Sequence, residues 1–267
     1  VRKFEMKNLF ASLIISMSLF SFFSCNKNTT NHRTSTQDES TMIVSQIING
    51  ETSTFSYADF HDLKNNKSYD RFLTGNLKLA TGKVICVDPL VSHLALAQNW
   101  KVPTGSYPVY IYIATSGDFD GRVAYAELSI NDEIPEYWEY SLIDEAKLNK
   151  AEKSLNGMYP VDAGLSCFAD HDAFQCYKQH IDTFYKKNPS GNYYNDVLEK
   201  YFNENAHIPP SSRGEDWINY TPESCSGNII MFGTGWGDGF YARYVGFDKN
   251  GNVVKLITDF IQLGSEE

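Results

Sequence analysis

The chain has 267 residues, of which 42% are hydrophobic and 21% charged. That composition is typical of a globular protein and excludes a disordered, collagen-like or coiled-coil chain. Acidic side chains outnumber basic ones by 33 to 23, which gives a formal net charge of -10. Non-specific nucleic-acid binding and attachment to anionic lipid both need an excess of Lys and Arg, so this charge argues against both.

Residues 1–24 have the pattern of a bacterial lipoprotein signal peptide. A short basic segment precedes an apolar run over residues 9–23, and this order is typical of a secretory signal. The run is shorter than the roughly 20 residues that a membrane-spanning helix needs. It ends at Cys25, and the ending resembles a lipobox, although Phe22 stands where Leu is usual. We therefore expect cleavage before Cys25 and its acylation with fatty acids such as palmitate.

The residues after Cys25 are predicted to be a tether. Residues 25–42 are polar and contain almost nothing that could be buried, and residues 43–267 are predicted to be a single globular domain. Asn26 directly follows Cys25, at the position where the known sorting pattern of inner-membrane lipoproteins has Asp. This favours a lipid-anchored protein of the bacterial cell envelope, held in the outer membrane. The alternative is an ordinary cleaved signal in which Cys25 is incidental.

The first part of the predicted domain contains mainly extended segments. Residues 43–60 are expected to be extended, with a short helix over 57–63. The apolar run 83–87 ends at an Asp-Pro turn and predicts a strand. Hydrophobic residues alternate over 107–115 and again over 122–130. Two such runs around a Gly/Asp-rich loop predict a β-hairpin.

The middle of the chain is predicted to be helical. Pro135 can open a helix, and large or apolar residues follow it at intervals of four: Trp138, Leu142 and Ala146. The strongest helical pattern covers 170–187, where Asp170 is a suitable N-cap. A shorter helix is expected over 196–204, and residues 206–227 are expected to be loops.

The C-terminal part is predicted to be a three-stranded meander. Its strands are expected at 228–232, 240–247 and 253–260. The turn 248–251 contains Asn-Gly, which accepts the positive φ angles of a tight hairpin. The predicted fold is therefore α+β, with a mostly antiparallel sheet, an early hairpin, inserted helices and the C-terminal meander.

The cysteines leave more than one interpretation open. If Cys25 carries lipid, four remain, which are Cys86, Cys167, Cys176 and Cys225. Four cysteines in an exported chain permit three disulfide pairings. Their spacing matches neither a CxxC motif nor a zinc site. Of the two interpretations, buried free thiols are favoured over disulfides.

Familiar catalytic motifs are missing, but three blocks place an Asp beside Gly or Pro at the end of a predicted strand. They define a candidate polar site of six residues: Asp88, Asp162, Cys167, Trp236, Asp238 and Asp259. A carboxylate in such a place can meet a ligand, or it can simply accept N–H groups of its own turn. We expect Asp162 and Asp238 to lie within about 10 Å of each other. No metal and no cofactor is assigned.

The order of these blocks resembles the bacterial domain-of-unknown-function family four-two-four-one. The resemblance runs from about Lys83 to Phe260. It is carried by the following residues: Asp88-Pro89, the PxGxYPV stretch 103–109, Arg122-Val123-Ala124, Trp138, Val161–Gly164, Cys167-Phe168, Asp170, Trp217 and the block 232–260. Small departures occur at Thr234, Ala242 and Leu165-Ser166. The family brings no established activity, so the resemblance supports the fold and leaves function open.

Two functions are compatible with these features. The first is an uncharacterised membrane-anchored lipoprotein whose domain is a non-catalytic binding or interaction module, with an unknown protein or small-molecule partner and no nucleic acid. The many aromatic residues favour it, since Tyr and Trp are enriched at interfaces. The alternative is a hydrolase or cation-dependent enzyme that uses the clustered Asp residues, with Cys167 as nucleophile and His171 as its partner.

Overall fold

The structure is a computed structural model that describes residues 46–48, 51–53, 61–91, 95–153, 155–204 and 217–261. The predicted signal peptide, Cys25 and the predicted tether lie outside the described residues. So do residues 57–60 of the first predicted helix and residues 206–216 of the predicted loop region. Residues 40–267 form one compact unit. Within the described ranges, none of the helices has the length and apolar character needed to cross a membrane.

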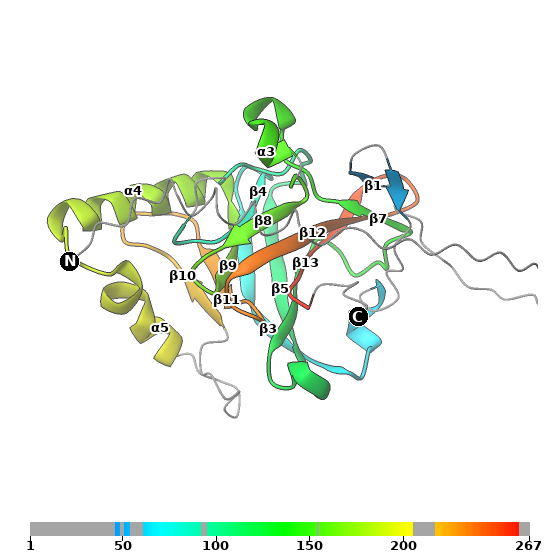
Figure 1. The fold of residues 1–267 in the computed structure, drawn as a ribbon, viewed down its shortest axis with the longest axis horizontal. Coiled ribbons are helices and arrows are strands. Elements are labelled where there is room, and N and C mark those ends of the chain that lie inside the picture. Colours follow the sequence, from blue (N-terminus) through cyan, green and yellow to red (C-terminus); the bar gives the residue numbers. More distant parts are fainter. Residues whose placement is uncertain are drawn as a thin grey trace, which may run out of the picture. The chain divides into compact units, whose positions relative to one another are not determined.

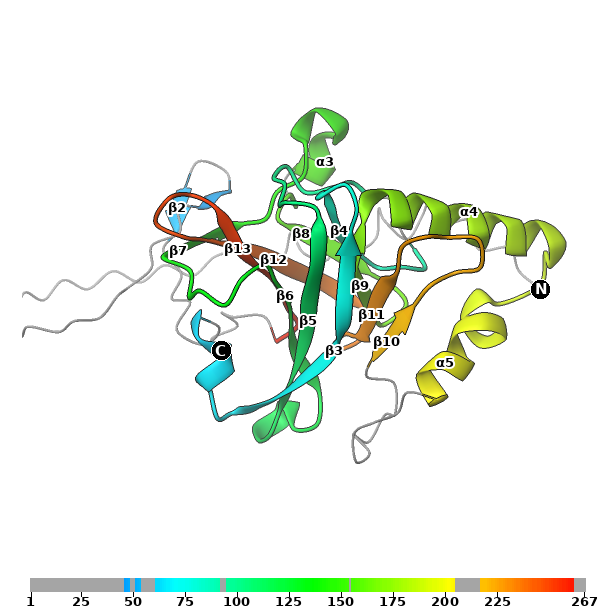
Figure 2. The same cartoon turned by 180° about the vertical axis from the view of Figure 1, so that it is seen from behind.

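The larger of two main sheets has seven strands, and all of its neighbouring strands are antiparallel. The order is β3-β5-β6-β13-β12-β7, and β8 pairs with a second stretch of β12. The strands are β3 (Tyr69–Leu79), β5 (Gly105–Ala114), β6 (Val123–Ser129), β7 (Tyr137–Tyr140), β8 (Met158–Val161), β12 (Gly239–Phe247) and β13 (Val253–Asp259). Figure 2 shows β3, β5 and β6 side by side in this sheet.

The smaller sheet has four antiparallel strands in the order β10-β11-β9-β4. They are β4 (Val84–Val87), β9 (Leu165–Asp170), β10 (Trp217–Tyr220) and β11 (Ile229–Gly233). A separate short hairpin joins β1 (Gln46–Ile48) to β2 (Glu51–Ser53). The long helix α4 (His171–Lys187) follows β9 directly and packs on β9 and β4, as Figure 1 shows.

The remaining helical segments are short. A π-helical turn (Tyr194–Leu198) leads into α5 (Glu199–Glu204), which packs on β10. The others are α3 (Lys150–Lys153) and three 3-10 turns: η1 (Leu63–Asn65), η2 (Gly117–Phe119) and η3 (Glu145–Lys147). The two sheets enclose one apolar cluster, which includes Ile111, Phe168 and Phe232. A second cluster lies between the smaller sheet and the helices, with Phe174 and Phe202.

Several predictions about individual elements are confirmed. The strands predicted around residues 107–115 and 122–130 are β5 and β6, and they pair antiparallel. The β12–β13 hairpin turns at Gly251, whose φ is +79°. Helix α4 covers the predicted range, and its N-cap Asp170 accepts a hydrogen bond from the N–H of Asp172 at 3.1 Å. The chain is mostly antiparallel and broadly α+β.

The helix predicted from Pro135 is wrong, because the chain forms β7 there. Residues 137–140 pair with β12, and Trp138 stands opposite Gly246. A Cβ atom at Gly246 would lie 2.5 Å from the Pro135 ring and 3.0 Å from the Trp138 ring. Burial of the Trp138 ring over a residue without a side chain therefore outweighs the helical spacing, since β-propensity depends on such cross-strand packing.

The prediction of a C-terminal three-stranded meander is also wrong, because β11 and β12 belong to different sheets. Strand β11 lies between β9 and β10, and its first four residues are buried. The loop that follows β11 carries the chain from the smaller sheet to the larger one. Three further strands were not predicted: β3, β9 and β10.

The preference for free thiols is wrong for one pair of cysteines. Cys176 on α4 forms a disulfide with Cys225, 49 residues further along the chain. Cys86 and Cys167 are free and buried. The spacing of the cysteines could not reveal the pair, because the packing of α4 brings Cys176 to the turn before β11.

Candidate functional site

Asp88 joins two turns of the chain through a buried carboxylate. It follows β4, and only 1% of its surface is exposed. Its Oδ1 accepts the N–H groups of Leu90 and Val91 at 2.7 and 3.1 Å. Its Oδ2 accepts those of Asp162 and Ala163, both at 2.9 Å. One side chain thereby fixes its own turn and the turn after β8.

Burial and hydrogen bonding act on this carboxyl group in opposite directions. Burial raises the pKa of Asp88, and the backbone N–H groups that point at it lower the pKa. The net shift is upward from the ordinary value. Because both oxygens of its carboxylate accept backbone N–H groups of these two turns, Asp88 has the surroundings of a structural residue.

The glycine-rich loop between β11 and β12 lies against the turn after β8. The N–H of Thr234 donates to the carbonyl oxygen of Gly164 at 3.0 Å. Gly164 and Gly237 have φ angles of +63° and +87°, and a Cβ atom on Gly164 would lie 3.8 Å from the Cα of Gly237. Positive φ is accessible to glycine at no steric cost, which allows this turn and this loop to meet.

Asp162 and Asp238 stand at the same end of one pair of strands. The last paired residues of β8 and β12 are Val161 and Gly239. Asp162 directly follows Val161 and Asp238 directly precedes Gly239, and both residues are exposed. Two exposed carboxylates therefore flank the point where the two strands part.

Trp236 lies in the same loop and is held in place while 47% exposed. The guanidinium carbon of Arg122 lies 4.4 Å from the centre of the Trp236 ring, and Phe119 meets the ring edge-on at 4.9 Å. The Nη1 of Arg122 also donates to the carbonyl oxygen of Gly235 at 2.7 Å. A half-exposed aromatic ring fixed in this way is suited to contact with a partner, because little side-chain entropy is lost on binding.

Asp259 and Cys167 are placed differently. Asp259 is 1% exposed, and its Oδ1 accepts the N–H of Ile261 at 2.9 Å. It pairs with Ala242, which is about 13 Å along β12 from Asp238 at the usual rise per residue. Cys167 lies in β9 with no exposed surface, and burial raises the pKa of its thiol well above the ordinary value.

The surroundings of Cys167 do not favour a nucleophile, since the thiolate is the reactive form and burial disfavours it. His171 begins α4, and its Nδ1 lies 2.8 Å from an oxygen of Asp172. The thiol of Cys86 is likewise fully buried, and burial raises its pKa to about 11.

A shallow hollow of about 360 Å³ lies next to the two turns that Asp88 joins. Its lining comes from the two turns that Asp88 joins, from the end of α4 and from the segment that follows α4. The lining residues are Leu90, Val91, Ala163, Tyr185, Asn192 and Tyr194. Because Ala163 lies between Asp162 and Gly164, the hollow adjoins the turn that carries the exposed carboxylate. We refer to the hollow together with Asp162, Trp236 and Asp238 as the strand-end surface.

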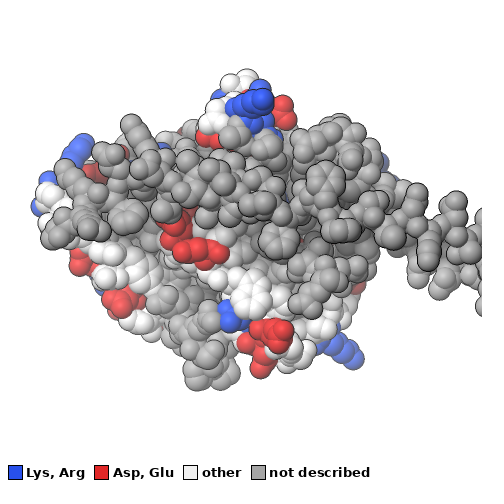
Figure 3. Space-filling model, viewed as in Figure 1, with Lys and Arg blue, Asp and Glu red and all other residues white. Residues whose placement is uncertain are grey.

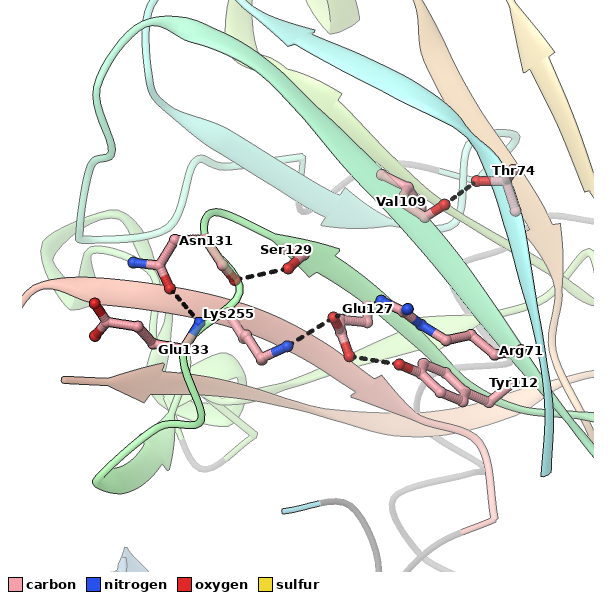
Figure 4. Close-up of polar contacts among 9 residues, drawn as sticks. All are labelled: Arg71, Thr74, Val109, Tyr112, Glu127, Ser129, Asn131, Glu133 and Lys255. Carbon is pink, nitrogen blue, oxygen red and sulfur yellow. Dashed lines mark hydrogen bonds and ion pairs between the residues drawn. The ribbon is translucent and has the colours of Figure 1, made fainter. Parts of the chain in front are cut away.

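A separate polar cluster surrounds Glu127 in the larger sheet (Figure 4). The carboxylate is 2% exposed and accepts bonds from Lys255 Nζ at 2.9 Å and from the Tyr112 hydroxyl at 2.8 Å. Arg71 Nη2 lies 3.8 Å from the same carboxylate. Since two cations and a hydroxyl surround one buried carboxylate, the charge of Glu127 is compensated within the sheet.

The charged side chains on one face can be followed in Figure 3. Asp and Glu of the described residues form several separate groups there, and Lys or Arg lie beside most of these groups. Over the whole chain the acidic side chains are in excess, with a net charge of -10. An acidic surface favours neutral or cationic partners over anionic ones.

The chain belongs to the family described as "Protein of unknown function (DUF4241)", whose model matches residues 77–258. The match covers more than half of the chain and includes the Asp88 turn, the turn after β8 and most of the β12–β13 hairpin. The searches of curated proteins and of solved structures found no match.

Sequence reasoning found the acidic blocks but missed the hollow. Tyr185 falls within the predicted helix 170–187, and only the structure shows that its side chain is 42% exposed. The sequence around Asn192 and Tyr194 does not indicate that they line a hollow, because a polar turn that does so has no local pattern of its own. The partners of Glu127 come from three other strands, so only the strand order brings them together.

Proposed function

We propose that this protein is a lipoprotein of the bacterial cell envelope, anchored in the outer membrane through Cys25, whose domain is a non-catalytic binding module. The observation that supports this proposal most strongly is that two of the candidate acidic residues are buried and two are exposed. Asp88 and Asp259 are buried and accept backbone N–H groups. Asp162 and Asp238 are exposed at one strand end. The buried pair belongs to the framework, and the exposed pair is available to a partner.

The disulfide supports the location outside the cytoplasm. Disulfides form and persist in oxidising compartments and are rare in the cytosol of most organisms. The Cys176–Cys225 bond links α4 to the turn before β11, and an exported chain can keep it.

The alternative function is a hydrolase or a cation-dependent enzyme. The observation that favours it is that Asp162 and Asp238 adjoin the last pair of β8 and β12, which is Val161 with Gly239. Two carboxylates so placed can divide into an acid and a base, or bind a hard cation. Asp88 and Asp259 would not take part, because both carboxylates are buried and accept backbone N–H groups.

Replacing Cys25 tests the anchor. We expect Cys25→Ala to abolish incorporation of labelled palmitate and to shift the protein out of the membrane fraction, or to leave the signal uncleaved, because acylation requires the thiol. The matched control is Cys86→Ala, which retains Cys25 and should remain labelled. Membrane association that survives in Cys25→Ala, with no lipid on the wild type, would refute the lipoprotein assignment.

A further inference from the structure

The hollow of the strand-end surface has rigid edges. Asp88 holds both turns that supply Leu90, Val91 and Ala163. On the other side, the Tyr185 hydroxyl accepts the N–H of Tyr193 at 3.3 Å, which ties the end of α4 to the segment after it. A site whose walls are fixed before binding loses less entropy when a ligand enters.

The lining combines aromatic, amide and aliphatic groups. The lining residues are two tyrosines, one asparagine and three aliphatic residues, and none of the lining residues that the structure describes is charged. A fully charged ligand would give up hydration here without gaining a counter-charge. The exposed carboxylates nearby add repulsion against anions.

A ligand for such a lining must itself have two kinds of surface. One part must be apolar enough to lie on a tyrosine ring, as sugar C–H groups do on aromatic faces. Another part must carry hydrogen-bonding groups without charge, which the side-chain amide of Asn192 can meet. A pyranose ring has both, with C–H groups on its faces and hydroxyls around its edge.

We propose that the hollow binds a neutral saccharide of one or two rings, with Tyr185 as the stacking platform. This inference rests on the proposed function, because it names the ligand class of that binding surface. The volume of about 360 Å³ is near the lower end of the range for small-molecule sites, which suits a short saccharide. Tyr185 contributes most, since its ring is 42% exposed and is supported edge-on by Phe184 at 5.2 Å.

Direct binding measurements test the proposal. The full mature chain, in a detergent without a sugar headgroup, is titrated with N,N′-diacetylchitobiose, cellobiose and maltose, and saturation-transfer NMR reports binding. At least one disaccharide should bind the wild type. Tyr185→Ala should raise the Kd about tenfold or more, since loss of an aromatic contact costs about 1.4 kcal/mol. Tyr185→Phe keeps the ring and should stay within about threefold.

Ile134→Ala is the matched control, because Ile134 is also a large exposed side chain, at 53%, and does not line the hollow. It should bind as the wild type does, and the melting temperature of each variant shows that it is folded. No binding of any of the three sugars at about 10 mM, where a millimolar ligand is mostly bound, overturns the saccharide assignment. Unchanged binding in Tyr185→Ala overturns the hollow as the site.

The same spectra separate failure of this inference from failure of the proposed function. If a bound disaccharide stays intact, both stand. If its resonances are replaced by those of monosaccharides, the saccharide assignment is supported and the non-catalytic function is overturned. If none of the three sugars binds, the saccharide assignment is overturned, and the binding module, which does not depend on a sugar ligand, stands.

Discussion

Replacing both disulfide cysteines by serine is expected to lower the free energy of unfolding by about 4 kcal/mol. The Cys176–Cys225 bond closes a loop of 49 residues, and the chain-entropy relation gives that value for a loop of this length. The melting temperature should fall by about 10 °C in a domain of this size. The measurement is thermal unfolding of the wild type and of Cys176→Ser/Cys225→Ser.

Reductant supplies the control. The wild type treated with dithiothreitol should melt close to the double variant, and the double variant should not respond to reductant. Cys86 and Cys167 are present in both proteins and buried in both, so they do not account for a difference. Equal melting temperatures for all four samples would show that the bond contributes nothing to stability.

Asp88→Ala is expected to cost about 3 kcal/mol or more. The substitution removes the acceptor of four backbone N–H groups, and each buried donor left unpaired costs about 1–3 kcal/mol before the turns relax. Asp88→Asn should fall between the wild type and Asp88→Ala, because the amide keeps one acceptor oxygen and turns donors toward the remaining N–H groups. Chemical denaturation measures all three.

Asp182→Ala is the matched control for Asp88, because it removes an exposed carboxylate on α4. It should change the free energy of unfolding by less than about 0.5 kcal/mol. A similarly small change in Asp88→Ala would mean that water or other groups satisfy these N–H groups, and that Asp88 does not hold the two turns together.

Local patterns were sufficient for elements whose own residues determine them. Helix α4 has its N-cap, its apolar stripe and its basic C-terminus within one segment. The β12–β13 hairpin has its Asn-Gly turn between two apolar runs. For each acidic block the sequence leaves two outcomes open, which are contact with a ligand and acceptance of backbone N–H groups. The position of the neighbouring turn, which the sequence does not give, decides between them.

Elements that depend on distant contacts could not be derived. The pairing of β11 with β9 and β10 is set by the packing of two sheets, and the sequence of a strand does not indicate which strands it pairs with. The helical spacing after Pro135 was overridden by packing of Trp138 on Gly246. The hollow joins residues 90–91 with residues 185–194, which only the docking of α4 brings together.

The central claim is that buried Asp88 and Asp259 stabilise the fold, whereas exposed Asp162 and Asp238 do not. The thermal unfolding of Asp162→Asn/Asp238→Asn tests this claim most directly. Both side chains are exposed, and the two residues adjoin the last pair of β8 and β12. Removing two like charges at such positions should leave the melting temperature within about 2 °C of the wild type or raise it slightly. A fall as large as that of Asp88→Ala would contradict this claim, because these carboxylates would then hold the turns and would not be available to a partner.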